Sequence, residues 1–183
     1  MMRRIPLVIL VVILSSFQST PFNKIKINKK ISILLPISFV PVPQDKMSTK
    51  FISYRDPIAA YTNETAEVEF GINTSTSFWR DTDVDLMRSF YKTNIVNLYD
   101  KVKFIQDDVQ TINRRKFAVF EYISTINPEN TSVLNDPPIV KYTYIEYAIV
   151  RGQVYLFDFT APSGQKDLWQ PVAQKIMSSV KIK

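Results

Sequence analysis

The side chains that could do chemistry in this sequence are carboxylates, lysines, tyrosines and serines, because its 183 residues include neither histidine nor cysteine. Ser-His and Cys-His nucleophilic machinery, thiol redox chemistry and ordinary zinc sites each need one of the missing residue types. The chain has three glycines, at positions 71, 152 and 164, and no phosphate-cradling loop can be assembled from them. The composition therefore favours a protein that is not an enzyme and holds no cofactor.

Three carboxylates interrupt stretches that are otherwise apolar: Glu121, Glu146 and Asp158. A buried carboxylate is costly unless it is paired, and burial raises its pKa as a general acid requires. One interpretation is a small hydrolase or lyase whose carboxylates converge in a cleft. The interpretation that we favour is that each carboxylate pairs with a cation such as Lys141 or Arg151 at a sheet edge, or reaches water between helices.

The spacing of Asp81, Asp83 and Asp85 resembles the opening of a calcium-binding loop. Leu86 stands where such a loop needs glycine, and Lys92 stands where it needs a bidentate glutamate. Carboxylates also favour the positive end of a helix dipole, so we interpret the three acids as a helix start and predict no metal site.

Aromatic residues offer a further candidate site. Tyr142, Tyr144 and Tyr155 could form an exposed platform for a sugar, a peptide or a partner protein. The competing interpretation places them beneath a helix with their hydroxyls reaching the rim. Together with Glu146 and Asp158, these tyrosines are the candidate binding residues of the sequence.

The densest basic cluster alternates with Ile25 and Ile27 and consists of Lys24, Lys26, Lys29 and Lys30. This alternation is typical of the solvent side of an edge strand guarded by lysines. A site for an anionic surface or a phosphate is the alternative.

The first 21 residues have the order of a secretory signal, with Arg3 and Arg4, an apolar run from Ile5 to Leu14, and small polar residues after it. The run is too short to span a bilayer comfortably, so we expect cleavage within residues 16–22, with an uncleaved anchor as the alternative. Cleavage would leave 21 of the 23 basic residues against 17 acidic ones, a net charge near +4. This mild charge is not typical of a nucleic-acid-binding protein.

An exported chain without cysteine must be stable through its core, which fits a bacterial periplasmic or extracellular protein. The N-x-S/T matches at Asn63, Asn73 and Asn130 are then expected to be chance, and they would matter only in a host that glycosylates.

A hairpin and a helix must position these residues. The β-branched and aromatic run Ile139–Val150, the turn Arg151-Gly152 and the run Gln153–Thr160 predict a hairpin in which Val150 faces Gln153. Both of its faces are apolar, which predicts a central position in a sheet covered on both sides. One face carries Tyr142, Tyr144, Ala148, Tyr155, Phe157 and Phe159, and the other carries Ile145, Tyr147, Ile149, Val154 and Leu156.

Helical spacing predicts the two covers of this sheet. One helix has Pro171 in its first turn and an apolar stripe of Trp169, Val172, Ala173, Ile176, Met177 and Val180. The other begins at Thr82 as its cap and runs to Tyr99. The remaining predicted strands are Phe22–Ile27, Ile31–Leu35, Phe51–Tyr54, Ala66–Asn73, Lys103–Ile112 and Phe117–Ile126, and Lys103–Thr160 is predicted to be a four-strand antiparallel meander.

Three stretches, residues 30–36, 112–121 and 157–180, resemble the PsbP/Mog-like superfamily, and most of all its small secreted bacterial members. They read KISILLP, INRRKFAVFE, and FDFTAP followed by WQP and IMSSV. The resemblance implies an α+β fold, an α/β/α sandwich around a twisted, mainly antiparallel sheet with two main helices. It also implies a scaffold for protein contacts rather than an enzyme family, and it carries over no functional residue.

We therefore expect a single domain over residues 22–183, exported, that binds a partner protein or a component of the cell envelope. We expect a monomer or weak dimer that binds no nucleic acid and has no integral membrane span after signal cleavage. The alternatives are the carboxylate-dependent hydrolase or lyase, and a carrier of an apolar ligand held between the sheet and a helix.

Overall fold

The structure is a computed structural model that describes residues 20–43, 57–128 and 137–183. The predicted signal before residue 20, the predicted strand Phe51–Tyr54 and Asn130 lie outside the described residues. The described strands are β1 (Phe22–Lys26), β2 (Ile31–Pro36), β3 (Val40–Pro41), β4 (Ala59–Thr62), β5 (Glu69–Thr76), β6 (Lys101–Ile112), β7 (Arg115–Ile126), β8 (Ile139–Val150), β9 (Gln153–Pro162) and β10 (Lys181–Ile182). The described helices are α2 (Val84–Leu98), the 3-10 turn η1 (Ser163–Gln165) and α3 (Lys166–Ser178).

The main sheet has seven strands in the order β3-β4-β5-β9-β8-β7-β6, and every neighbouring pair is antiparallel. Strands β6 to β9 form the predicted meander, and β8 and β9 are central as predicted. Val150 pairs with Gln153 across the hairpin turn. Arg151 and Gly152 have φ values of 51° and 73°, the left-handed conformations that a two-residue hairpin turn needs.

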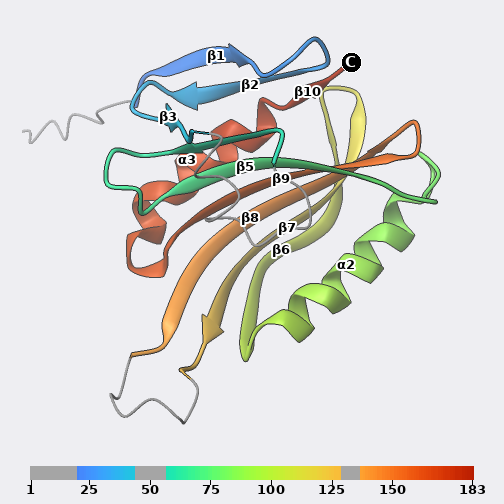
Figure 1. Cartoon of the computed structure of the whole chain (residues 1–183). Coiled ribbons are helices and arrows are strands. Elements are labelled where there is room, and N and C mark those ends of the chain that lie inside the picture. The colour runs from blue at the N-terminus through green and yellow to red at the C-terminus, as the bar shows by residue number, and fades with distance from the viewer. Residues whose placement is uncertain (1–19, 44–56, 129–136) are drawn as a thin grey trace, which may run out of the picture.

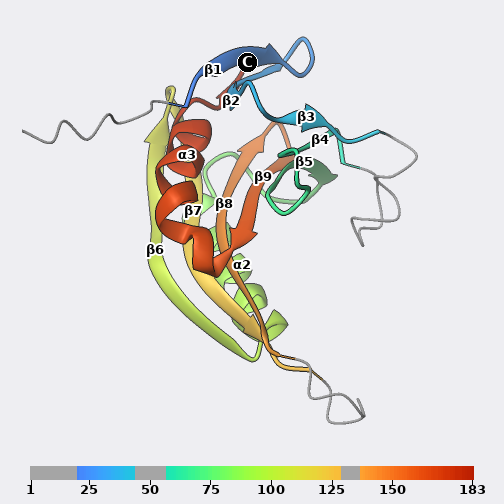
Figure 2. The same cartoon turned by 90° about the vertical axis from the view of Figure 1, so that its left-hand side faces the viewer.

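Two helices cover opposite faces of this sheet, and the predicted α/β/α sandwich is confirmed (Figures 1 and 2). One core cluster joins α3 and β2 to the sheet face that carries Phe157, and the other joins α2 to the face that carries Ile145. We call these the α3 face and the α2 face. The two sets of hairpin residues predicted from the alternation lie on these two faces as expected. No helix in the described ranges is long and apolar enough to cross a membrane.

Helix α3 buries its predicted stripe, with Ile176 and Met177 both 0% exposed. The prediction that Pro171 lies in its first turn is wrong, because the helix begins at Lys166 and Pro171 is an interior residue. The 3-10 turn η1 runs directly into the helix and starts it earlier than the apolar spacing indicates. Proline has no N–H, so it cannot bond the carbonyl of Asp167 one turn before it.

The cap of helix α2 lies one residue after the predicted cap. The capping position is Asp83 rather than Thr82, and the Asp83 carbonyl accepts the Met87 N–H at 2.8 Å. The Asp83 carboxylate accepts hydrogen bonds from the Arg80 backbone N–H at 3.0 Å and from its guanidinium at 3.1 Å. The helix-start interpretation of the acids is therefore right for Asp85 in the first turn, whereas Asp83 stabilises the turn before the helix.

An ion-pair cluster fixes α2 to the edge strand β6. Asp107 Oδ1 accepts the Arg88 Nε–H at 2.7 Å, and its Oδ2 lies 2.5 Å from Lys92 Nζ. Partial burial raises the pKa of Asp107, but the hydrogen bonds from Lys92 and Arg88 outweigh it and hold the pKa below 3.8. Asp107 therefore docks α2 on β6, and the register shift of β6 lies just before it, between Phe104 and Gln106.

Replacing Asp107 with asparagine should lower the free energy of unfolding by about 1–3 kcal/mol at neutral pH, because two cations lose their charged acceptor. The pKa of Asp107 is lower in the folded protein than its ordinary value of 3.8. The stability that the ionised Asp107 contributes is therefore fully present above pH 3.8 and is lost as the pH falls through the pKa of the folded state. Urea unfolding at neutral pH and at about pH 3 measures the difference. Asp108→Asn is the matched control, since Asp108 is exposed and bonds the amide of Gln106.

A second, three-stranded sheet has the order β1-β2-β10. The predicted N-terminal hairpin forms it with the short strand after α3, and Ile31, Ile33 and Leu35 on its inner side belong to the core of the α3 face. Strand β4 was not predicted from the sequence. The strand expected at Ala66–Asn73 is β5, which covers Glu69–Thr76.

Candidate anion-binding groove

The turn between β1 and β2 is shaped by one side chain. Asn28 Oδ1 accepts the backbone N–H of Lys30 at 2.7 Å and that of Ile31 at 2.9 Å. Asparagine favours such turns because its short side chain can replace a backbone acceptor. The closed turn leaves Lys29 and Lys30 exposed at one end of the three-stranded sheet.

The register of this sheet places lysines on its outer side. Ser32 pairs with Lys26 on β1 and with Lys181 on β10. Because Ile31 and Ile33 point into the core, side-chain alternation directs Ser32 and both of its partners outward. Lys24, two residues before Lys26, lies on the same outer side, and all three lysines are exposed.

The hairpin between β6 and β7 closes one side of this surface. Asn113 and Arg114 form its turn with φ values of 47° and 72°. The Asn113 amide donates to the carbonyl of Ser178 at 3.2 Å and to that of Val180 at 2.8 Å. These bonds hold Arg114 beside the last strand of the chain.

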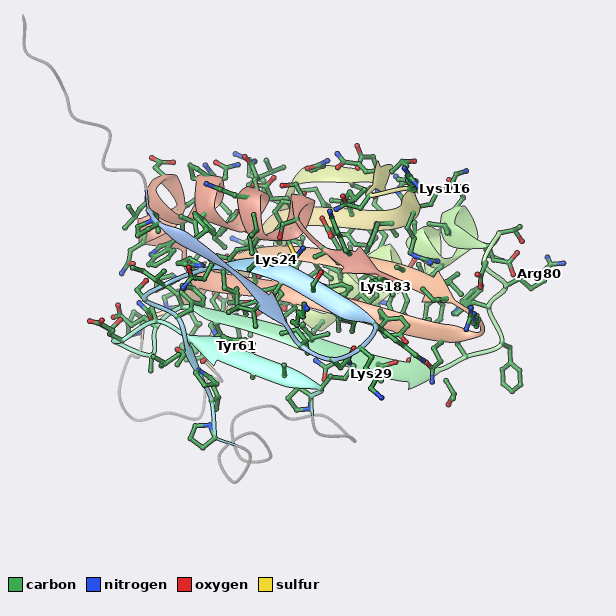
Figure 3. All side chains as sticks on the ribbon, turned by 90° about the horizontal axis from the view of Figure 1, so that it is seen from above. Lys24, Lys29, Tyr61, Arg80, Lys116 and Lys183 are labelled. Carbon is green, nitrogen blue, oxygen red and sulfur yellow. The ribbon has the colours of Figure 1, made fainter. Side chains whose placement is uncertain are left out.

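These segments surround an open hollow of about 860 Å³, which we call the basic groove. It is lined by Lys24, Lys26, Asn28, Lys29, Lys30, Ile31, Ser32, Asn113, Arg114, Lys181, Ile182 and Lys183. A smaller hollow of about 280 Å³ continues it toward Ser178 and Ser179. Figure 3 shows Lys24, Lys29 and Lys183 on this side of the molecule, with Lys116 on the neighbouring β6–β7 hairpin.

The lining of the basic groove carries six lysines and one arginine, and it includes no aspartate or glutamate side chain. None of these seven cations is ion-paired within residues 20–43, 57–128 and 137–183. Converging charges of one sign raise the local concentration of oppositely charged ligands. The arrangement can therefore hold an anion with ammonium groups, the Arg114 guanidinium and the Ser32 hydroxyl as hydrogen-bond donors.

The predicted tyrosines lie elsewhere, in the core of the α3 face. Tyr142, Tyr144 and Tyr155 are 0%, 5% and 4% exposed, so the exposed platform is not formed and the alternative of burial is right. The Tyr142 hydroxyl donates to Glu121 Oε1 at 2.9 Å, and the Tyr155 hydroxyl donates to Gln153 Oε1 at 3.0 Å. A role for these tyrosines in ligand binding stays a prediction.

The three carboxylates do not converge. Glu121 and Glu146 lie on the α3 face, whereas Asp158 lies with Leu156 on the α2 face. Glu121 accepts hydrogen bonds from Tyr142 and from Gln170 of α3. None of the three lines either hollow described above, so the geometry that a carboxylate hydrolase or lyase needs is not formed by these residues.

Glu146 contradicts the prediction that each of these acids is paired. It is 0% exposed, and neither carboxyl oxygen has a hydrogen-bond partner among the described residues. Burial raises its pKa to about 8. Burial, with the nearby charge of Glu69, raises the pKa of Asp158 to about 7, while the charge of Lys141 lowers it. A binding role for Glu146 and Asp158 stays a prediction.

Sequence reasoning identified only part of the basic groove. Its four N-terminal lysines were recognised, and the edge-strand interpretation is right because β1 is an edge of its sheet. Arg114, Lys181 and Lys183 were missed as members of the same surface. The available signal was the alternation Lys181-Ile182-Lys183, which repeats the pattern of Lys24-Ile25-Lys26.

Comparison of sequences gives no match, either to a protein-family model or to a curated protein. Solved structures do match. The cyanobacterial PsbP protein CyanoP from Synechocystis sp. PCC 6803 superposes with a TM-score of 0.62 at 11% identity, over 94% of this chain and 99% of that one.

Two further structures are similar over most of their length. The Ran-binding protein Mog1p of Saccharomyces cerevisiae has a TM-score of 0.56 at 9% identity, over 90% of this chain and 96% of that one. LpqN of Mycobacterium tuberculosis, involved in cell envelope biogenesis, has a TM-score of 0.55 at 9% identity, over 89% and 91%. At these identities the likeness concerns the fold alone.

Proposed function

Because the chain has the fold of the PsbP/Mog-like superfamily, as its sequence resemblance predicted, we propose that it is a binding domain and that the basic groove contacts an anionic partner. The observation that carries this proposal is the lining of the groove, which places seven basic side chains and no acidic side chain around a hollow of about 860 Å³. Unneutralised charge of one sign on one surface is typical of a site for a ligand of the opposite sign.

The similar structures support binding rather than catalysis. Mog1p is described as a Ran-binding protein, and LpqN as involved in cell envelope biogenesis. In this chain the three acidic residues considered for catalysis lie on two opposite sheet faces, and the absence of histidine and cysteine from the sequence excludes the commonest nucleophilic machinery.

We further propose that the domain acts outside the cytoplasm of a bacterium, on a partner protein or an envelope component. This proposal rests on the order of charged, apolar and small polar residues in the first 21 positions. An envelope rich in anionic polymers and headgroups would offer the basic groove its ligands. Detection of the processed chain in a periplasmic or culture fraction tests this location, and its recovery only from cytosol would contradict it.

Charge reversal of Lys26 and Lys181, the two partners of Ser32, should abolish retention of the protein on immobilised heparin at about 0.15 M ionic strength, where charges within about 8 Å still interact. Heparin serves as a polyanion of no particular biological identity. The measurement is the salt concentration that elutes Lys26→Glu/Lys181→Glu compared with the unaltered chain.

The matched control is Lys101→Glu/Lys103→Glu, which changes the net charge equally at exposed positions outside the groove. It should elute close to the unaltered chain. Equal losses in the two double variants would show that heparin responds to net charge alone, and the groove would then not be the binding surface.

A further inference from the structure

We propose that the basic groove takes the phosphate groups of an anionic phospholipid surface, an inference that rests on the proposed anion-binding function. The groove therefore docks the domain on a membrane face rather than on a nucleic acid or an acidic protein. Three features of its lining lead to this occupant: the choice of lysine, the lack of aromatic rings, and the arrangement of charges on one side of a small sheet.

The composition of the groove differs from that of a protein interface. Buried interface cores are enriched in aromatic residues, methionine and arginine, and lysine is depleted there. The groove has six lysines, one arginine and no aromatic or methionine residue in its lining. Its apolar members are Ile31, which is 1% exposed and already used by the core, and the half-buried Ile182. A partner protein would find little apolar surface to bury there.

Nucleic acids are also a poor fit. Proteins that bind single strands stack the bases on aromatic side chains along a basic channel, and the groove lining provides no such ring. Sequence readout in a duplex depends on a helix or strand ribbon that enters a groove with arginine, asparagine or glutamine at base edges. The basic groove instead presents lysines, which act as flexible point charges and do not impose the planar bidentate geometry of arginine.

The sheet register spreads these charges over an area. Lys26 and Lys181 stand on either side of β2, about 10 Å apart for two strand spacings, and Lys24 lies about 7 Å along β1 from Lys26. Lys29 and Lys30 continue the array at the turn, and Lys183 is held beside them by its backbone N–H bond to the Lys30 carbonyl at 2.9 Å. Long lysine side chains on such an array can each reach a separate headgroup.

The number of charges suits a membrane surface. Protein segments that bind anionic lipids typically carry about four to eight basic residues. Each basic side chain near the membrane surface raises the affinity for the membrane about fivefold. The groove offers seven. Fluid headgroups can move to meet the ammonium groups, so this mode of binding needs neither a fixed ligand shape nor apolar contacts.

Vesicle sedimentation with the full chain tests the inference. The unaltered protein should bind phosphatidylcholine vesicles that contain phosphatidylglycerol, and Lys26→Glu/Lys181→Glu should bind them at least about 25-fold more weakly, at about fivefold for each of the two lysines lost. Lys101→Glu/Lys103→Glu should bind like the unaltered chain, and Lys26→Arg/Lys181→Arg should keep binding. Every variant retains the apolar run Ile5–Leu14, so any contribution of this run to vesicle binding is the same in all of them. Binding to vesicles of phosphatidylcholine alone measures that contribution.

The substituted positions are exposed, and circular dichroism of each variant checks that the fold is kept.

Binding should also vanish in about 1 M salt, where charges are screened beyond about 3 Å. If the groove variant and the control bind vesicles equally while heparin still separates them, the lipid inference is wrong and the anion-binding function stands. If neither vesicles nor heparin distinguishes the groove variant from the control, both the lipid inference and the proposed anion-binding function are wrong.

Two further measurements, each also run as a competition against vesicles, identify the source of the phosphate. Stronger groove-dependent binding to a single-stranded oligonucleotide than to vesicles would overturn the lipid inference in favour of nucleic acid. Release of the protein from vesicles by millimolar glycerol phosphate would overturn it in favour of a free phosphate ester. Retention in the presence of both competitors is the result that we expect for an extended headgroup surface.

Discussion

Raising the pH from about 4.5 to about 8 should progressively destabilise this protein, and Glu146→Gln should remove the largest single part of that dependence, with the raised pKa of Asp158 contributing much of the rest. Glu146 lies on the α3 face between Val119 of β7 and Phe157 of β9, with both carboxyl oxygens unpaired among the described residues. Burial raises its pKa from 4.5 to about 8, so the folded protein keeps a neutral carboxylic acid at pH 7.

The sign follows from the protons bound in each state. Between pH 4.5 and about 8 the folded state holds a proton on Glu146 that the unfolded chain has released, so stability falls as pH rises through this window. At 1.36 kcal/mol for each unit, the full loss above pH 8 is about 5 kcal/mol. Many domains have only about 5–15 kcal/mol in total, so the alkaline loss would be large.

Urea unfolding at intervals from pH 4 to pH 9 measures this effect. Glu146→Gln keeps the shape of the side chain and cannot ionise, and it should be more stable than the unaltered protein at pH 9. Asp158→Asn provides the comparison, because the pKa of Asp158 is also raised by burial, to about 7, and its contribution falls in a lower pH window. If Glu146→Gln follows the unaltered pH profile, Glu146 is not buried as an unpaired acid.

Replacing Ile176 with aspartate should unfold the protein or leave it with little residual stability. Ile176 is 0% exposed and lies where α3 packs against the sheet and β2. An aspartate there would place an unpaired charge in the core in addition to removing the apolar side chain, and either change alone costs several kcal/mol. The milder Ile176→Ala should lower the free energy of unfolding by about 2–5 kcal/mol.

Circular dichroism and urea unfolding measure both Ile176 variants. Gln174→Asp is the matched control, because it introduces the same charge two residues away on the exposed side of α3. It should change stability by no more than about 0.5 kcal/mol. A soluble, fully folded Ile176→Asp variant would contradict the position of α3 over the sheet.

Local periodicity explains what could be predicted from the sequence. Alternation assigned Tyr144 and Phe157 to one sheet face and Ile145 to the other, and helical spacing assigned Ile176 to the buried side of α3. These patterns repeat over eight or more residues and depend only on the geometry of one element. Element ends were less well predicted. Helix α3 follows η1 and begins at Lys166, well before Pro171, and the cap of α2 is Asp83, the residue after Thr82.

The basic groove could not be predicted in full, because it depends on contacts between distant segments. Lys26 and Lys181 face one direction only because β10 pairs with β2, and Arg114 joins them only because Asn113 bonds the carbonyls after α3. No local pattern determines those pairings. Short elements have the same limitation, since β4 has only four residues, Ala59-Ala60-Tyr61-Thr62, and these show no clear alternation of apolar and polar side chains.

The pairing of β10 with β2 also affects how the fold can be completed. Ile182 pairs with Ile31, 151 positions earlier, and α3 packs on that same early strand. Contacts between such distant positions are slow to form because a long loop must close first. During synthesis the N-terminal hairpin must therefore wait for the last residues before its inner side is covered. A ribosome-bound chain that lacks residues 166–183 should accordingly remain sensitive to protease at β1 and β2, long after the central meander has been made.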